Sequence, residues 1–163
     1  MVVIVMGVAG SGKTTIASEL ARTLGWEFLD ADSLHSPANV AKMHAGIPLD
    51  DADRAPWLQA LRREIERSLA GTRSLALACS ALKQSYREQL LVSPDVKLVY
   101  LRGTFEVLRQ RLEQRKGHFM PEQLLASQLE TLEEPADAIT VDVQHSVDEM
   151  IAEILTKIRG GAA

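Results

Sequence analysis

Apolar residues along the chain occur either in short continuous runs or at the spacing of one helix face. The run at residues 2–6 is apolar at every position, which is typical of a strand inside a parallel sheet that is covered on both faces. Four later runs are similar and predict further strands. The five expected strands are residues 2–6, 26–29, 74–78, 96–101 and 138–143.

The stretches between these runs carry apolar residues three and four positions apart, which is the spacing of an amphipathic helix. The first helix is expected to end at Gly25, because glycine suits the left-handed turn after a helix. The last is expected to begin with the capping-box pair Ser146 and Glu149. The other expected helices are residues 37–45, 58–69, 84–91, 105–112 and 121–129.

Strands that alternate with helices predict an α/β fold with a parallel sheet of five strands. Helices on both faces of the sheet make this a three-layer α/β/α arrangement, in which ligands bind beyond the carboxyl ends of the strands. The sequence contains no linker, internal repeat or low-complexity tract, so we expect a single domain over residues 1–163.

Composition and charge exclude several classes of protein. Apolar residues make up 46% and charged residues 25% of the chain, as in an ordinary globular protein. A net charge of −4 argues against a protein that coats nucleic acid, and no apolar run is long enough to cross a membrane. The single cysteine, Cys79, cannot form an internal disulfide. We therefore expect a cytoplasmic protein with no nucleic-acid or membrane partner.

A phosphate-binding motif follows the first strand directly. Residues 7–14 read GVAGSGKT and fit the pattern G-x-x-x-x-G-K-S/T, in which glycines let backbone N–H groups turn inward around phosphates. Lys13 supplies positive charge for the β- and γ-phosphates, and Thr14 supplies a hydroxyl for Mg²⁺. The fold is therefore expected to be of the P-loop NTPase type, with a nucleotide bound in this loop. The expected nucleotide-binding residues of this loop are Gly7, Ala9, Gly10, Ser11, Gly12, Lys13, Thr14 and Thr15.

Two carboxylates, Asp30 and Asp32, follow the second expected strand. Positions two apart in an extended chain project to the same side, so we expect both carboxylates to face the γ-phosphate. One would then serve the metal and the other an acceptor hydroxyl; the alternative is a solvated acidic turn. The third strand ends at Cys79 and Ser80 without an acid, unlike the metal-binding strand of most switches and motors.

Polar residues are dense from residue 32 to residue 58, without the pattern of a core. This density beside a phosphate site predicts a pocket for a polar acceptor. Taken singly, each residue has a plainer interpretation; Asp53, for example, would suit the cap of the following helix.

Several blocks of this sequence resemble gluconate kinases. They are DADSLH at 30–35, KM at 42–43, GIPLDDADRAPWL at 46–58, ACSALK at 78–83 and YR at 86–87. Later matches are RL at 111–112, Arg115, HFM at 118–120, SQ at 127–128, TLE at 131–133 and Pro135. The resemblance runs from residue 3 to about residue 143 and implies transfer of the γ-phosphoryl group of ATP to the 6-hydroxyl of D-gluconate. It also implies a cytosolic protein that is typically a homodimer. Shikimate kinase is similar in its phosphate loop and paired aspartates but lacks the blocks at 53–57 and 79–83.

Gluconate is a polyol with a carboxylate, so its pocket needs cations and hydrogen-bonding groups. Arg54 and Arg87 have side chains that can grip a carboxylate with two bonds. Alternatively, Arg87 and Lys83 are solvated, and Trp57 belongs to the core rather than to a substrate platform. The expected acceptor-binding residues are Asp32, His35, Lys42, Arg54, Ser80, Lys83, Arg87 and His118.

Arg111 and Arg115 are four residues apart on an expected helix and would share one face. We expect a helical lid over residues 111–122 that closes on ATP, excludes water and neutralises the transferring phosphoryl group. The alternative is a surface face of salt bridges. After the fifth strand, Val143 and Gln144 are expected to contact adenine, by analogy with relatives of the fold.

Together these expectations define a catalytic hypothesis. Thr14 and Asp30 hold Mg²⁺, while Asp32 receives the proton of the acceptor hydroxyl; the roles of the two aspartates are interchangeable at this stage. Two other functions stay open: a kinase of another small hydroxy acid such as shikimate, and a nucleotide-dependent switch module. The expected catalytic residues are Lys13, Asp30, Asp32, Arg111 and Arg115.

Overall fold

The computed structural model describes residues 1–115 and 122–161. Within these residues, a sheet of five parallel strands has the order β2-β3-β1-β4-β5. The strands are β1 (Val2–Met6), β2 (Glu27–Asp30), β3 (Leu75–Ala78), β4 (Val96–Arg102) and β5 (Ile139–Asp142). The predicted fold class is confirmed, and each strand lies within two residues of its predicted bounds.

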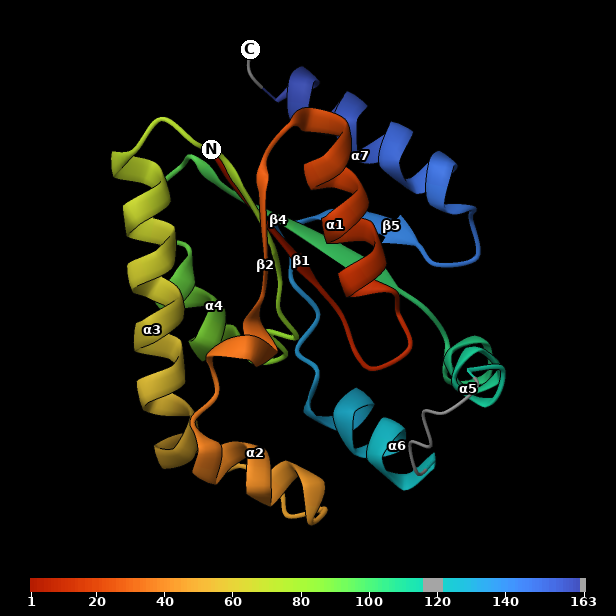
Figure 1. Ribbon diagram of the computed structural model, residues 1–163. Helices are drawn as coiled ribbons and strands as arrows, with labels where there is room; N and C mark the ends of the chain where they lie inside the picture. Colours follow the sequence, from red (N-terminus) through yellow and green to blue (C-terminus); the bar gives the residue numbers. More distant parts are fainter. Residues whose placement is uncertain (116–121, 162–163) are drawn as a thin grey trace.

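Helices cover both faces of the sheet, and others lie beyond its carboxyl end. Figure 1 shows α1 and α7 on one face, α3 and α4 on the other, and α2, α5 and α6 near the ends of the strands. The helices are α1 (Lys13–Leu24), α2 (Pro37–His44), α3 (Asp51–Ala70), α4 (Gln84–Leu90), α5 (Phe105–Glu113), α6 (Glu122–Thr131) and α7 (Val147–Gly160), with a short 3₁₀ helix η1 (Ala31–Leu34).

The central strand β1 separates two apolar cores. Val3 and Val5 pack in the cluster beneath α1 and α7, whereas Val2, Ile4 and Met6 pack in the cluster beneath α3 and α4. Alternate residues of a strand point to opposite faces, so a strand with two covered faces must be apolar throughout. This explains why the first run of the sequence is continuous rather than alternating.

Helix ends depend on their caps. The predicted capping box at α7 is confirmed, since Ser146 and Glu149 each accept the other's backbone N–H at 3.1 Å. Helix α3 begins at Asp51, seven residues before the predicted start at residue 58. The reason is a second capping box, in which Asp50 is the cap and Asp53 is its partner three residues later. The cap is therefore Asp50, three residues before Asp53, which the sequence had suggested for this position.

In the part of the chain that the structure describes, none of the helices is both long enough and apolar enough to cross a membrane.

Candidate active site

The phosphate loop joins β1 to α1 and depends on glycine at two positions. Gly10 has φ +81° and Gly12 has φ +92°, a backbone region that favours glycine. A Cβ added to Gly10 would also lie 3.0 Å from Cγ of Leu112. Gly12 precedes α1 without a side chain that caps it, so the first N–H groups of α1 open toward the loop, as at many anion sites.

The loop holds its own shape through the carbonyl of Val8. This carbonyl accepts hydrogen bonds from the Ser11 hydroxyl at 2.7 Å and from the Lys13 ammonium at 3.1 Å. Burial lowers the pKa of Lys13, an effect that the nearby charge of Asp32 opposes. An anion bound in the loop would therefore stabilise the charged form of Lys13.

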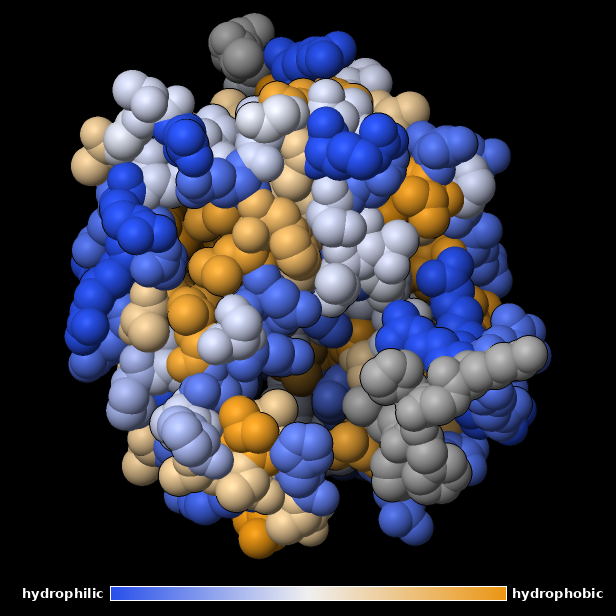
Figure 2. Space-filling view, in the orientation of Figure 1, coloured by the Kyte–Doolittle hydropathy of each residue, from blue (hydrophilic) through white to orange (hydrophobic). Residues whose placement is uncertain are grey.

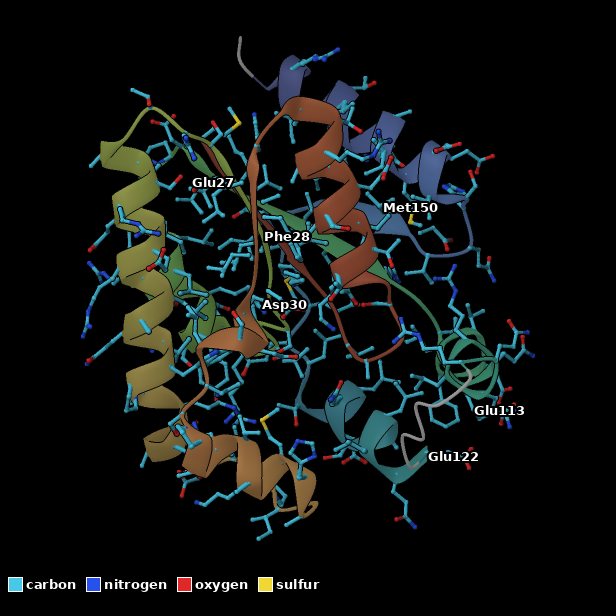
Figure 3. All side chains as sticks on the ribbon, in the orientation of Figure 1. Glu27, Phe28, Asp30, Glu113, Glu122 and Met150 are labelled. Atoms are coloured by element: carbon cyan, nitrogen blue, oxygen red, sulfur yellow. The ribbon has the colours of Figure 1, made fainter. Side chains whose placement is uncertain are left out.

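The carboxylate of Asp30 lies directly beside the start of α1. Its Oδ2 accepts a hydrogen bond from the Thr14 hydroxyl at 3.0 Å, and its Oδ1 accepts the backbone N–H of Asp32 at 3.0 Å. Figure 3 shows Asp30 at the end of β2, where the chain turns into η1. The predicted extended geometry over residues 30–32 was wrong, because Asp30 caps a 3₁₀ turn that contains Asp32.

Asp32 has a higher affinity for protons than an ordinary aspartate. The pKa of its carboxyl is raised above 3.8, first by the loss of hydration among the surrounding groups and then by the charge of Asp30. The charges of Lys13 and His35 act in the opposite direction. A carboxylate with a raised pKa is suited to receive a proton from a hydroxyl.

Thr14 and Asp30 together offer a pair of oxygen ligands that fits Mg²⁺. Their oxygen atoms are 3.0 Å apart, and hard oxygen ligands are those that Mg²⁺ prefers. Among residues 1–115 and 122–161, no group of three or more His, Cys, Asp or Glu side chains could hold a metal. This agrees with Mg²⁺ sites in nucleotide-binding proteins, which take few protein ligands and complete their shell with phosphates and water.

On the acceptor side, Trp57 organises η1 and His35. Its indole N–H donates to the carbonyl of Ala31 at 2.7 Å, and its ring stacks on His35 with centroids 4.4 Å apart. Asn39 lies 3.3 Å from Nδ1 of His35 and donates to the carbonyl of Asp53 at 2.8 Å. Burial lowers the pKa of His35, so His35 is suited to hydrogen bonding rather than to charge. The interpretation of Trp57 as a core residue is confirmed, since it is buried, and its ring also supports His35.

Two cations meet around Tyr86. Arg54 donates to the Tyr86 hydroxyl at 3.2 Å, and that hydroxyl donates to Asp51 at 2.7 Å. Lys83 lies 3.5 Å from Asp51, and its ammonium is 5.5 Å from the centre of the Tyr86 ring. This cluster of α3 and α4 (Arg54, Lys83, Tyr86 and Asp51) places positive charge where the sequence predicted an acceptor pocket. Figure 2 shows a hollow nearby, with η1 and α2 on one side and α6 on the other.

The chain is similar to known proteins over almost its whole length. A family model described as an AAA domain matches residues 2–135. A gluconokinase from Gluconobacter oxydans is 46% identical, over 93% of this chain and 88% of the relative. The chain belongs to the gluconokinase family. The thermoresistant gluconokinase of Escherichia coli is 42% identical to this member, over 97% and 93% of the two chains.

A solved structure agrees with this membership. The crystal structure of a gluconokinase from Sinorhizobium meliloti superimposes with a TM-score of 0.84, at 44% identity, over 94% of this chain and 89% of that one. The predicted family is therefore confirmed, and with it the class of ATP-dependent P-loop kinases.

Two residues of this gluconokinase-family chain that were expected to bind the acceptor form hydrogen bonds within the protein. Lys42 pairs with both carboxylate oxygens of Asp53 at 2.9 Å. Arg87 is 4% exposed, and its guanidinium donates to the carbonyls of Ala81, Leu82 and Glu133. A two-bond grip on a substrate carboxylate does not fit this placement of Arg87. The side chain instead holds the turn between β3 and α4, which includes Ser80 and Lys83.

The two lid arginines do not share a helix face as predicted. Helix α5 ends at Glu113, so Arg115 lies beyond it. Arg111 donates to the carbonyl of Val143, and its guanidinium would be 3.9 Å from a Cβ on Gly12. Arg111 therefore lies beside the phosphate loop.

Three further predicted site residues are Val143 and Gln144, which follow β5, and His118 of the expected lid. The Val143 side chain is fully buried, and its backbone N–H donates to the carbonyl of Arg102 at 3.0 Å. The N–H of Gln144 donates to Asp142 at 2.8 Å. His118 and residues 116–121 of the expected lid lie outside the described residues.

The sequence analysis missed one residue that contacts the phosphate loop. The side-chain oxygen of Gln128 on α6 accepts the backbone N–H of Ala9 at 2.7 Å. These residues are 119 positions apart, so no spacing rule could connect them. The N–H of Ala9, which was expected to face the nucleotide, is directed to α6 instead.

Proposed function

We propose that the protein transfers the γ-phosphoryl group of ATP to the 6-hydroxyl of D-gluconate, with 6-phospho-D-gluconate and ADP as products. The observation that carries the proposal is the hydrogen bond between Thr14 and Asp30, at 3.0 Å. It places the Asp30 carboxylate next to the phosphate loop, and Asp32 follows two residues later. Membership of the gluconokinase family supports this choice of substrate over shikimate and over a switch function.

The nucleotide lies in the phosphate loop. Backbone N–H groups of residues 10–15 surround the phosphates, and Lys13 contributes positive charge. Thr14 and Asp30 hold Mg²⁺, which supplies charge that stabilises the phosphates during transfer. Arg111 adds positive charge beside the loop, and residues 111–122 form the lid, with Arg115 directed toward the phosphates. Adenine lies beside the segment that follows β5, at Val143 and Gln144.

Asp32 acts as the general base. As the acceptor oxygen forms its bond to the γ-phosphorus, the proton of the hydroxyl moves to the Asp32 carboxylate. The bond from that phosphorus to the β-γ bridging oxygen breaks, and ADP leaves. The raised pKa of Asp32 supports this role, whereas the contact of Asp30 with Thr14 suits metal binding.

The acceptor lies between η1 and the Tyr86 cluster. Arg54 and Lys83 bind the gluconate carboxylate, because each lies within 5.6 Å of the centre of the Tyr86 ring. Neutral His35 and Ser80 bind hydroxyl groups, together with His118 of the lid. Lys42 and Arg87 act through Asp53 and the 79–83 turn, respectively, rather than through direct contact.

An ADP-release assay over a panel of acceptors tests the proposal. D-gluconate is expected to accelerate ADP release from protein and Mg-ATP, whereas shikimate and D-glucose leave the rate at the level with water alone. Arg54→Met is expected to raise KM for gluconate by about 10- to 100-fold, the effect of losing one or two charged hydrogen bonds. Arg63→Met, at an exposed site on α3, is the control. No stimulation by gluconate would refute the proposed substrate.

The oligomeric state and compartment are part of the same proposal. We expect a homodimer, as the family resemblance implies, and analytical ultracentrifugation measures it directly. We place the protein in the cytoplasm, as the family resemblance implies.

A further inference from the structure

We propose that Gln128 is a positioning residue for the nucleotide site, because it holds the rim of the phosphate loop at Ala9 and ties α6 to that loop. This inference rests on the proposed function only in taking ATP as the nucleotide. It adds a residue outside the phosphate-loop motif to the machinery that shapes the loop.

The contact itself is well formed. The N–H of Ala9 lies 2.7 Å from the side-chain oxygen of Gln128, at the short end of the range for such bonds. Helix α6 is anchored beside it by Leu125, which is fully buried in the core that faces α1 and α7. Residues three apart lie on the same helix face, so the burial of Leu125 directs Gln128 toward the loop.

The neighbouring residue of the loop contacts the other helix that flanks the lid segment. Gly10 packs against α5 so closely that an added Cβ would be 3.0 Å from Cγ of Leu112 and 3.2 Å from the carbonyl of Leu108. Consecutive loop residues thus contact α6 and α5. Figure 3 shows Glu113 and Glu122 at the ends of these helices, on either side of residues 116–121. A shift of either helix therefore acts on the same part of the loop.

The chemistry of the side chain fits this position. The amide oxygen of Gln128 accepts the N–H of Ala9 without adding charge. A glutamate would accept the same bond, but it would bring a negative charge next to a site for phosphates, and like charges repel. A methionine would preserve the size of the side chain but could not accept the bond well. The two substitutions therefore separate the hydrogen bond from the charge.

Nucleotide binding and amide exchange test the inference, and steady-state kinetics with gluconate add a third measurement. In Gln128→Met, we expect the Ala9 amide to exchange its hydrogen at least about tenfold faster, and ATP to bind about three- to tenfold more weakly, the range for one lost hydrogen bond. The KM for ATP rises accordingly, while the KM for gluconate stays within about twofold. Gln123→Met, at an exposed site on the same helix, should leave each of these quantities unchanged.

Gln128→Glu provides the second arm. We expect Ala9 to stay protected from exchange while ATP binds more weakly, with a loss that shrinks as salt is added. Unchanged exchange at Ala9 in Gln128→Met would overturn the inference. Faster exchange with unchanged ATP binding would also overturn it, since the bond would then be structural alone. If Gln128→Met does not fold, the exchange and salt results for Gln128→Glu decide. Failure of gluconate phosphorylation would affect none of these binding measurements, so it refutes only the proposed function.

Discussion

Substitution of Arg87 by methionine separates a structural role from a role in substrate binding. The side chain is 4% exposed, and its guanidinium donates to the carbonyl of Ala81 at 2.9 Å, to that of Leu82 at 3.0 Å and to that of Glu133 at 2.7 Å. Ala81 has φ +43°, which is unfavourable for a residue with a Cβ. Arg87 therefore stabilises a strained turn and connects it to the segment after α6.

The magnitude follows from the carbonyls that lose their donor. Leu82 also accepts the N–H of Glu133 at 2.9 Å, so it keeps a partner, whereas the carbonyls of Ala81 and Glu133 lose the arginine. A buried acceptor without a partner costs about 1–3 kcal/mol. This cost applies to Ala81, which is 2% exposed, whereas Glu133 is an exposed residue, so water can replace the arginine there. Burial lowers the pKa of Arg87, and removing this buried charge recovers part of the cost. We expect a net loss of about 2 kcal/mol in the free energy of unfolding.

Thermal denaturation and steady-state kinetics measure the two roles separately. A loss of about 2 kcal/mol lowers Tm by about 4–8 °C in a chain of this size, and we expect the KM for gluconate below the new Tm to change less than about threefold. Arg63→Met, exposed on α3, should change stability by less than about 0.5 kcal/mol. An unchanged Tm with a KM raised 100-fold or more would refute the structural role and restore Arg87 as a substrate ligand.

Three further predictions concern the carboxylate pair, the phosphate loop and η1. Because burial and the charge of Asp30 raise the pKa of Asp32, kcat/KM should fall as pH decreases through that raised pKa. In Asp32→Asn, kcat should fall by about 10²–10⁴, and this decrease of kcat/KM at low pH should disappear. A wild-type pH profile in the variant would contradict the assignment of Asp32 as the base. Gly10→Ala places a Cβ 3.0 Å from Leu112 in a residue with φ +81°. Calorimetry should detect weaker ATP binding, and the free energy of unfolding should fall by about 1–3 kcal/mol. Unchanged ATP binding would contradict the packing argument. Trp57→Phe removes the N–H that donates to the carbonyl of Ala31. The free energy of unfolding should fall by about 1–3 kcal/mol, and the KM for gluconate should rise. An unchanged KM would show that the position of η1 does not depend on this bond.

Features that depend on neighbouring residues were predicted well. The five strands and the cap of α7 follow from patterns within a few residues, because backbone geometry sets the period of side chains along a strand or helix. The phosphate loop is a run of eight consecutive residues, so its pattern of glycines and lysine can be recognised from the sequence alone. Asp30 was placed correctly for the same reason, since it directly ends a strand.

Features that depend on competition between partners were predicted poorly. Lys42 and Arg87 have the charge that a gluconate pocket needs, but Asp53 and three carbonyls are their partners in the folded chain. The geometry at Asp32 was also missed, because the side chain of Asp30 turns the chain immediately after β2. Residue type limits which bonds a side chain can make, whereas burial and distance select among them.

By itself, the sequence determined the order of strands and helices, the phosphate loop and the resemblance to gluconate kinases, all of which are encoded in short, contiguous blocks. Only the tertiary structure showed that Lys42 and Arg87 bond to groups of the protein itself, whereas Arg54 and Lys83 lie around Tyr86. It alone also revealed the bond between Gln128 and Ala9, across 119 positions. The physical reason is that a hydrogen bond requires its atoms within about 3 Å, and for distant residues the packing of the sheet and helices sets that distance.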